Sequence, residues 1–212
     1  MSEARDAIFA ALREAPHFPA QPPARLRPPA MPEDPIAILR ARITEAGGHF
    51  QILRDTSLPE GLELPIEAES VTHVYSAIPS LPSRGAGREA HTPHDLAPLE
   101  LCVIEAELAV VESGAAWHVP ANSLERAAVV LAEHLVVLVR EEALVATLHQ
   151  AYERIDLRNT RFGWFLCGPS KTADIEQALV MGAHGSCSMS LALVRRRGEA
   201  AAATQHDAPS GR

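Results

Sequence analysis

Two stretches of this 212-residue chain combine residue types that could carry out chemistry. In the first, Glu112, Ser113 and Gly114 stand between two apolar runs. A carboxylate at the end of a strand can serve as a nucleophile or as a base. A solvated turn carboxylate is the alternative without a catalytic role. The pattern makes Glu112 a candidate catalytic residue, and Ser113 and Gly114 candidate substrate-binding residues.

The second stretch is the loop from Gly168 to Thr172, which supplies two hydroxyls, one ammonium group and backbone N–H groups. At the amino terminus of a helix such groups can hold a carboxylate or a phosphate. Helix capping by Thr172 is the alternative, and the glycine spacing is not that of a Walker loop. The candidate substrate-binding residues here are Gly168, Ser170, Lys171 and Thr172.

Two further side chains stand close to this loop in the sequence, and both are candidate catalytic residues. His184 follows a predicted helix and precedes a strand, where it could move a proton or contact a substrate. Asp174 falls in the first turn of that helix, where it could orient His184 or a substrate hydroxyl. Each has a structural alternative: backbone hydrogen bonding for His184, and attraction to the helix dipole for Asp174.

The elements around the loop predict a βαβ unit. The continuous apolar run 162–167 is typical of a buried strand. Ile175, Ala178 and Leu179 follow helical spacing within 172–182, and Gly182 suits the end of a helix. Because 189–194 reads as the next strand, we expect two parallel strands with a right-handed crossover.

The rest of the chain supplies further elements. The patterns predict helices at 2–14, 34–47, 123–133 and 141–155, strands at 50–53, 71–78, 108–112, 115–119 and 134–139, an apolar run at 101–104, and long loops at 58–70 and 79–98. Ser113 and Gly114 suit a two-residue hairpin turn. Alternation of strands and helices predicts an α/β fold, with an open, mostly parallel sheet flanked by helices.

Such sheets bind ligands beyond the carboxyl ends of their strands, and we expect the 112–114 and 168–172 stretches to meet there. The domain boundaries follow the composition. Residues 1–33 form an N-terminal helix and a Pro-rich linker, 34–195 the α/β domain, and 196–212 a disordered tail. The linker is a spacer or, alternatively, carries a helix that docks on a partner subunit.

Composition narrows the function classes. The net charge of −8 argues against nucleic acid and anionic membrane as partners. No signal peptide and no apolar run near the length of a membrane span is evident, and three scattered cysteines suit a reducing cytoplasm. His91 and His94 lie three apart without a convincing third ligand, so we predict no metal site.

The sequence GPSKTADIE at 168–176, followed by GAHG at 182–185, resembles the signature of the LUD domain in the lactate utilisation protein C family. That signature reads G-P-S-x-T-A-D-I-E and then G-V-H-G-P. Ala183 replaces the usual Val, and Ser186 replaces the usual Pro beside His184. A looser match runs from Glu107 to Gly114, with Glu for Asp and Ser for Thr. The resemblance covers roughly residues 71–194.

The resemblance implies a fold like that of the CoA transferases, ribose-5-phosphate isomerase and glucosamine-6-phosphate deaminase. It implies a subunit of a cytoplasmic complex that oxidises L-lactate to pyruvate, together with an iron–sulfur subunit and a third lactate-utilisation subunit. A Glu is the nucleophile in CoA transferases of this fold, which bears on Glu112 by analogy only. The chain has no C-x-x-C-x-x-C run and no G-x-G-x-x-G fingerprint, so its cofactor is unknown.

Two alternatives stay open at this point. One is a stand-alone enzyme of the same fold that binds a CoA ester, a sugar phosphate or another small anion. The other is a regulatory subunit without catalysis. A homo-oligomer is compatible with each of them.

Overall fold

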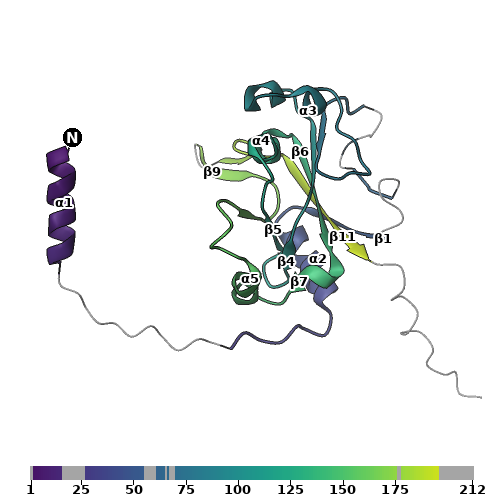
Figure 1. The fold of residues 1–212 in the computed structure, drawn as a ribbon. Coiled ribbons are helices and arrows are strands. Elements are labelled where there is room, and N and C mark those ends of the chain that lie inside the picture. The colour runs from purple at the N-terminus through teal and green to yellow at the C-terminus, as the bar shows by residue number, and fades with distance from the viewer. Residues whose placement is uncertain are drawn as a thin grey trace, which may run out of the picture.

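The computed structural model describes residues 2–15, 27–54, 61–64, 66, 70–175 and 178–195 (Figure 1). The predicted disordered tail and much of the 58–70 loop lie outside these residues. Helix α1 (Ser2–Glu14) forms where the sequence predicts it, and its apolar side chains Ile8, Phe9 and Leu12 are exposed. No helix in the described ranges is long and apolar enough to cross a membrane.

The centre of the molecule is a five-stranded sheet in the order β1-β11-β6-β3-β2, and every pair in it is parallel (Figure 1). Its strands are β1 (His49–Arg54), β11 (Ser188–Arg195), β6 (His134–Arg140), β3 (Leu101–Glu105) and β2 (Val74–Ser76). The three middle strands are buried on both faces, which explains why they read as continuous apolar runs. The expected parallel α/β sheet is therefore confirmed.

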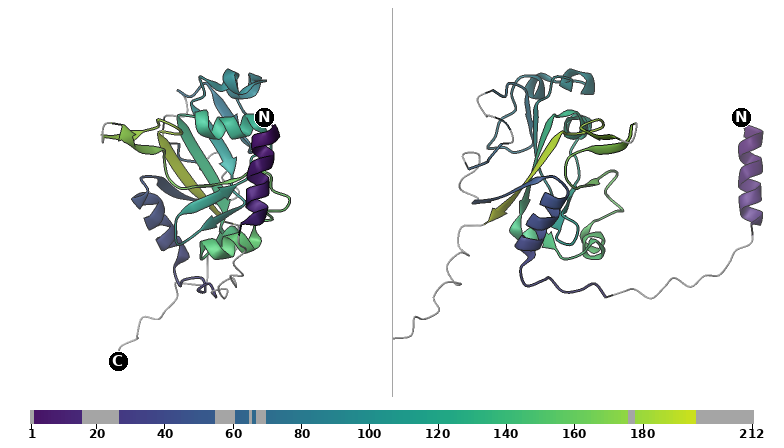
Figure 2. Two further views of the ribbon diagram at one scale, coloured as in Figure 1. Left: turned by 90° about the vertical axis from the view of Figure 1, so that its left-hand side faces the viewer. Right: turned by 180° about the vertical axis from the view of Figure 1, so that it is seen from behind.

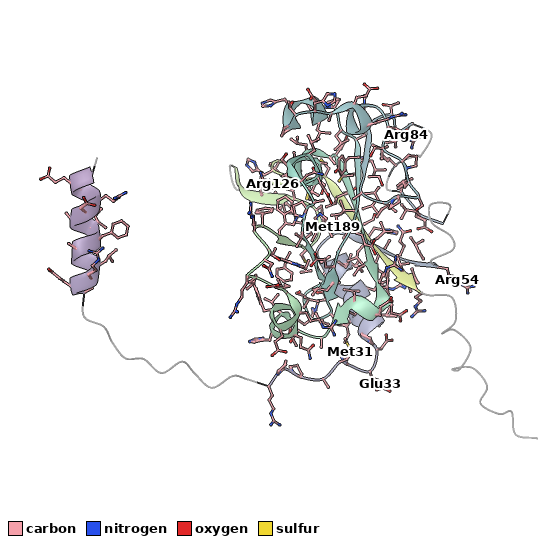
Figure 3. All side chains as sticks on the ribbon, viewed as in Figure 1. Met31, Glu33, Arg54, Arg84, Arg126 and Met189 are labelled. Carbon is pink, nitrogen blue, oxygen red and sulfur yellow. The ribbon has the colours of Figure 1, made fainter. Side chains whose placement is uncertain are left out.

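Helices cover one face of this sheet. Helix α2 (Pro35–Glu45) begins at its N-cap Asp34, whose carboxylate accepts a hydrogen bond from the Ala37 amide at 2.9 Å. Helix α4 (Ser123–Leu131) begins at Asn122 in the same way. Both helices contribute to one apolar core with β3, β6 and β11. In Figure 3 Met189 of β11 lies inside this core, where it is 1% exposed, whereas Arg126 of α4 points outward.

The opposite face of the sheet is covered by loops. Its core consists of the other side chains of the same strands. The residues that pack on it are partly buried aliphatic side chains of loop segments: Leu62, Leu64, Ile66, Ile78 and Leu81. The predicted 79–98 loop contains two short helices, α3 (Ala86–Glu89) and the 3-10 helix η2 (Pro93–Leu96).

A second, four-stranded sheet has the order β7-β4-β5-β8. Strands β4 (Leu108–Val110) and β5 (Ala115–His118) form the predicted hairpin, but the predicted two-residue turn is wrong, because four residues (111–114) connect the strands. The Gly114 amide donates to the Val110 carbonyl oxygen at 2.8 Å, and Gly114 has a φ of 73°. Strands β7 (Leu144–Val145) and β8 (Trp164–Leu166) complete the sheet, and α5 (Leu148–Arg154) packs on it.

The predicted helix at 141–155 is wrong in its first half. Residues 141–143 form the 3-10 helix η3 (Glu141–Ala143), β7 follows, and α5 begins only at Leu148. The helix begins there because the Thr147 hydroxyl accepts a hydrogen bond from the Gln150 amide at 3.3 Å.

The predicted βαβ unit is also wrong. Residues expected to form its helix instead form an antiparallel hairpin of β9 (Lys171–Ile175) and β10 (Ala178–Met181). The preceding strand β8 belongs to the second sheet, where it runs antiparallel to β5. The hairpin projects from the side of the molecule and joins neither larger sheet (Figure 2).

Backbone hydrogen bonds explain this outcome. The Ser170 amide donates to the Ser186 carbonyl at 2.9 Å, and the Ser170 carbonyl accepts from the Gly182 amide at 3.0 Å. These bonds hold the two ends of the segment side by side, as a hairpin requires and a helix does not allow. Gly182 has the positive φ (76°) that the sequence suggests, but it ends a hairpin and not a helix.

Candidate functional site

A pocket of about 590 Å³ lies beyond the carboxyl ends of β2, β3 and β6. The end of β5 and the start of α4 close its other side. Its polar lining consists of Tyr75, Glu105, Glu107, His118, Glu125, Arg140 and Glu142. This is the edge where open α/β sheets bind ligands, because the connections from neighbouring strands diverge there.

The innermost polar groups of the pocket are His118 and Glu125. Nε2 of His118 lies 3.2 Å from Oε1 of Glu125, and the side chains are only 4% and 6% exposed. Nδ1 of His118 lies 3.0 Å from the Glu105 carbonyl oxygen, and Oε2 of Glu125 accepts from the Ala121 amide at 3.0 Å. Both ring nitrogens of His118 thus lie close to acceptor oxygens, although the contact between Nε2 and Glu125 does not have hydrogen-bond geometry.

The surroundings of this pair shift several proton affinities. Burial acts to raise the pKa of the Glu125 carboxyl, but His118 and the Ala121 amide outweigh it and hold that pKa below its ordinary value. Burial raises the pKa of the Tyr75 phenol, and the charge of Glu125 raises it further. Burial also raises the pKa of the Cys102 thiol, on the strand beside Tyr75. Near neutral pH the Glu125 carboxyl is therefore ionised, while Tyr75 keeps its proton.

Arg140 stands at the more open side of the pocket, at the end of β6. Its Nε donates to Oε1 of Glu105 at 3.0 Å, and the two side chains are 41% and 46% exposed. Ion pairs this exposed contribute little stability, so a ligand carboxylate can exchange with Glu105 at small cost. Four carboxylates line the pocket against one guanidinium and one imidazole, which disfavours polyanionic ligands.

The two stretches singled out in the sequence do meet, but elsewhere. The Cys167 thiol, next to Gly168, donates to the Ser113 carbonyl at 3.3 Å. Gly168 packs closely on Ala46, just before β1 begins, and Ser170 bonds to Ser186, just before β11 begins. The meeting point is therefore at the amino edge of the central sheet. The predicted placement beyond the carboxyl ends is wrong, because the 168–187 segment precedes β11 as a hairpin and not as a crossover helix.

At this amino edge Glu112 and Ser113 are exposed, and Gly114 lies against α2. The Glu112 carboxylate accepts a hydrogen bond from the Leu148 amide at 2.6 Å, and the Ser113 hydroxyl accepts one from the Ala115 amide at 3.4 Å. Both side chains thus have partners that shape local structure. Catalytic and binding roles for them stay predictions.

The remaining candidates lie on or beside the β9–β10 hairpin. Lys171 is exposed and Thr172 half-buried on β9, Asp174 lies on the same strand, and His184 is exposed between β10 and β11. No helix begins at Thr172, so the anion site expected at a helix amino terminus loses its physical basis. The structure does not bring Lys171, Thr172 or His184 to the strand-end pocket.

Sequence reasoning missed the residues of the pocket. Glu125 stands three residues after the N-cap Asn122, which is the spacing of a capping box, so its position in the sequence indicates a structural role. His118 ends an apolar strand and has no neighbour in sequence that marks it. Their pairing depends on the turn between β5 and α4. Among the described residues, no group of three or more His, Cys, Asp or Glu is placed to hold a metal ion.

Comparisons with known proteins place this geometry in a family context. The model of the LUD domain matches residues 71–194, a range that includes every polar residue of the pocket. The crystal structure of a DUF162 family protein from Deinococcus radiodurans is similar in fold. Its TM-score is 0.56, its sequence identity 16%, and the alignment covers 79% of this chain and 99% of that one. No curated protein matches the chain.

Proposed function

Because the chain belongs to the LUD-domain family, which is associated with lactate utilisation, we propose that it is the substrate-binding subunit of a cytoplasmic system that oxidises L-lactate to pyruvate. The strand-end pocket is the substrate site in this proposal. The iron–sulfur and third subunits implied by the resemblance are its partners.

One observation carries the choice of site: a single pocket joins the half-exposed Arg140 to the buried His118–Glu125 pair. A 2-hydroxy acid has a carboxylate next to a carbon that bears a hydroxyl. Arg140 suits the carboxylate, because guanidinium groups bind carboxylates through two parallel hydrogen bonds. The His118–Glu125 pair suits the hydroxyl, because the Glu125 carboxylate offers acceptor oxygens on a nearly buried side chain.

The size of the pocket fits a shared site. A volume of about 590 Å³ is within the range of pockets for drug-sized ligands and exceeds the needs of a three-carbon acid. The remaining space can admit an electron-accepting group from a partner. This chain has neither the iron–sulfur cysteine spacing nor the dinucleotide fingerprint, so the acceptor is assigned to the partner subunits in this proposal.

The charge of the pocket lining favours this function over the alternative enzyme of the same fold. CoA esters and sugar phosphates carry several negative charges. Glu105, Glu107 and Glu142 line the pocket near Arg140 and would repel them. A monoanionic hydroxy acid meets one cation with less repulsion, so the lining favours lactate over the phosphate-bearing ligands.

The test is lactate-dependent dye reduction by this chain co-expressed with an iron–sulfur protein encoded beside it. Arg140→Gln should raise the KM for L-lactate by about 10- to 100-fold, because a charge-assisted hydrogen bond to a carboxylate is lost. Glu105→Gln is the matched control: it removes the competing carboxylate, so the KM should stay constant or fall. His149→Gln, on the exposed surface of α5, should change nothing.

Lactate-dependent dye reduction that persists when this chain is omitted would contradict a role for this chain in lactate oxidation. The next measurement would then be a thermal-shift screen of the isolated chain against phosphates and CoA esters, in which stabilisation would favour the alternative enzyme. A chain that is required for activity but insensitive to Arg140→Gln would contradict the pocket assignment and favour a regulatory subunit.

A further inference from the structure

Resting on the proposed function, we infer that Glu125, held in place by His118, is the group that takes the hydroxyl proton from the 2-hydroxy acid. The geometry that carries this inference is the nearly buried contact between His118 and Glu125, at the inner end of a pocket whose more exposed side holds Arg140. Tyr75 faces the same pocket from β2 and acts as the hydroxyl donor to the reacting oxygen.

Glu125 has the acceptor capacity for this role. An ionised carboxylate offers about four acceptor positions. The Ala121 amide takes one on Oε2, and His118 stands at one on Oε1. Glu125 also lines the pocket, so a ligand hydroxyl can reach an acceptor position without displacing either partner.

The pair is fixed before a ligand arrives. His118 is anchored through Nδ1 to the Glu105 carbonyl oxygen, and this contact places Nε2 3.2 Å from Oε1 of Glu125. The backbone of Glu125 is anchored too, because its amide donates to the Asn122 side chain at 2.9 Å. A charged group that is already oriented needs no reorganisation when proton transfer occurs. His118 is therefore a positioning residue, and Glu125 is the residue that contacts substrate.

The chemical step balances with these assignments. The O–H bond of L-lactate breaks and its proton passes to the Glu125–His118 pair. The C2–H bond breaks and its hydrogen leaves with both electrons to a flavin-class two-electron acceptor on the partner subunit. The C2–O bond becomes a carbonyl and the product is pyruvate. Tyr75 stays protonated and donates its hydroxyl hydrogen to the same oxygen.

A purely structural role gives a different expectation. The pair joins the end of β5 to α4, and removal of one member of a buried, interacting pair typically destabilises the fold. Such a loss would lower the thermal stability and the yield. It would not lower the turnover number of folded protein, and it would not change the sensitivity of turnover to D2O.

The experiment compares Glu125→Gln with wild type in the reconstituted complex, after thermal unfolding confirms that both are folded. Glu125→Gln should lower kcat by about 10²- to 10⁴-fold, the usual contribution of a general base, while the KM for L-lactate changes little. The solvent isotope effect on kcat should increase, because proton transfer becomes slower than the other steps. Glu153→Gln, the same chemical change on the surface of α5, should match wild type.

Each outcome decides between the inference and its premise. Folded Glu125→Gln with normal kcat and a normal isotope effect overturns the base assignment and leaves the lactate function intact. Failure of wild-type protein to bind L-lactate, measured by calorimetry, removes the proposed function itself. If Glu125→Gln does not fold, Tyr75→Phe decides: a kcat lower by about tenfold or more supports the site, and an unchanged kcat overturns it.

Discussion

The Glu112 carboxylate accepts a hydrogen bond from the Leu148 amide at 2.6 Å, which ties the β4–β5 turn to the first residue of α5. The first amides of a helix lack partners within the helix, and a carboxylate there also complements the dipole. Glu112→Ala should therefore lower the free energy of unfolding by about 1 kcal/mol, as for other helix caps. Urea denaturation measures this loss.

Glu112→Gln separates this structural role from the catalytic role that the sequence suggests. Its amide oxygen can still accept from Leu148, so stability should fall by less than in Glu112→Ala. Lactate-dependent turnover that drops sharply in well-folded Glu112→Gln would favour the catalytic prediction. Unchanged turnover would leave helix capping as its function.

The stability of the protein should decrease in acid, with a contribution from Glu125. Its folded-state pKa is depressed below the ordinary 4.5, so its contribution is fully present above pH 4.5 and is lost as the pH falls through the folded pKa. Glu100, whose pKa is lowered by the amides of His73 and Thr72, acts in the same direction.

Chemical denaturation at a series of pH values from 6 down to 3 measures this dependence. Glu125→Gln should be less stable than wild type near neutral pH, and the difference should shrink below pH 4.5. A difference that stays constant over the whole series would contradict the depressed pKa.

Gly168 and Gly47 form a matched pair for testing how the 168–172 loop packs. Both have positive φ, 71° and 80°. A Cβ on Gly168 would lie 2.7 Å from the Ala46 carbonyl oxygen, whereas the nearest atoms to a Cβ on Gly47 would belong to the flexible end of Lys171. Gly47→Ala should cost about 1 kcal/mol, and Gly168→Ala about 3 kcal/mol, because backbone cannot move aside as a lysine can. Equal losses in thermal unfolding would contradict the contact with α2.

The three cysteines should differ in reactivity. Cys102 is buried and its pKa is raised by burial, so it should resist iodoacetamide until the protein unfolds. Cys167 and Cys187 are exposed and should be modified in the folded state. Burial also raises the pKa of Cys167, while Lys171 acts to lower it. Lys171→Ala should therefore slow the modification of Cys167 and leave Cys187 unchanged, as mass spectrometry of digests would show.

Hydrogen exchange should separate the β9–β10 hairpin from the central sheet. The hairpin has two strands, and it exposes Leu179 by 66% and Met181 by 41%. A two-stranded unit with so little burial opens at low cost. Its amides should exchange orders of magnitude faster than those of β6 and β11. Equal protection in both regions would mean that the hairpin is held by contacts outside the described residues.

Much of the fold follows from patterns that the sequence displays. The strands β6 and β11 are apolar because both faces are buried, and Asp34 with Pro35 marks the start of α2. The hairpin around Ser113 and Gly114 follows from local backbone preferences, although its turn is two residues longer than predicted. Each of these features depends either on residues that are adjacent in the sequence or on burial, which shows as a continuous apolar run. Both kinds of signal are visible in a single sequence.

The hairpin and the pocket could not be predicted in this way. Thr172 suits a helix cap as well as a strand. Backbone hydrogen bonds of Ser170 with Ser186 and Gly182 determine that the segment forms a hairpin. The pairing of His118 with Glu125 depends on how β5 and α4 meet. Tertiary contacts decide both cases, and they override local propensity where the local signal is ambiguous.

The position of β11 between β1 and β6 has a consequence for synthesis on the ribosome. Strand β1 pairs only with β11 in the described sheet, and the paired residues His49 and Ser190 lie roughly 140 residues apart. A nascent chain that has emerged through β6 therefore holds an apolar strand without its neighbour. Translation exposes this unpaired edge until the last strand leaves the exit tunnel, and that interval is when the chain is most in need of a chaperone.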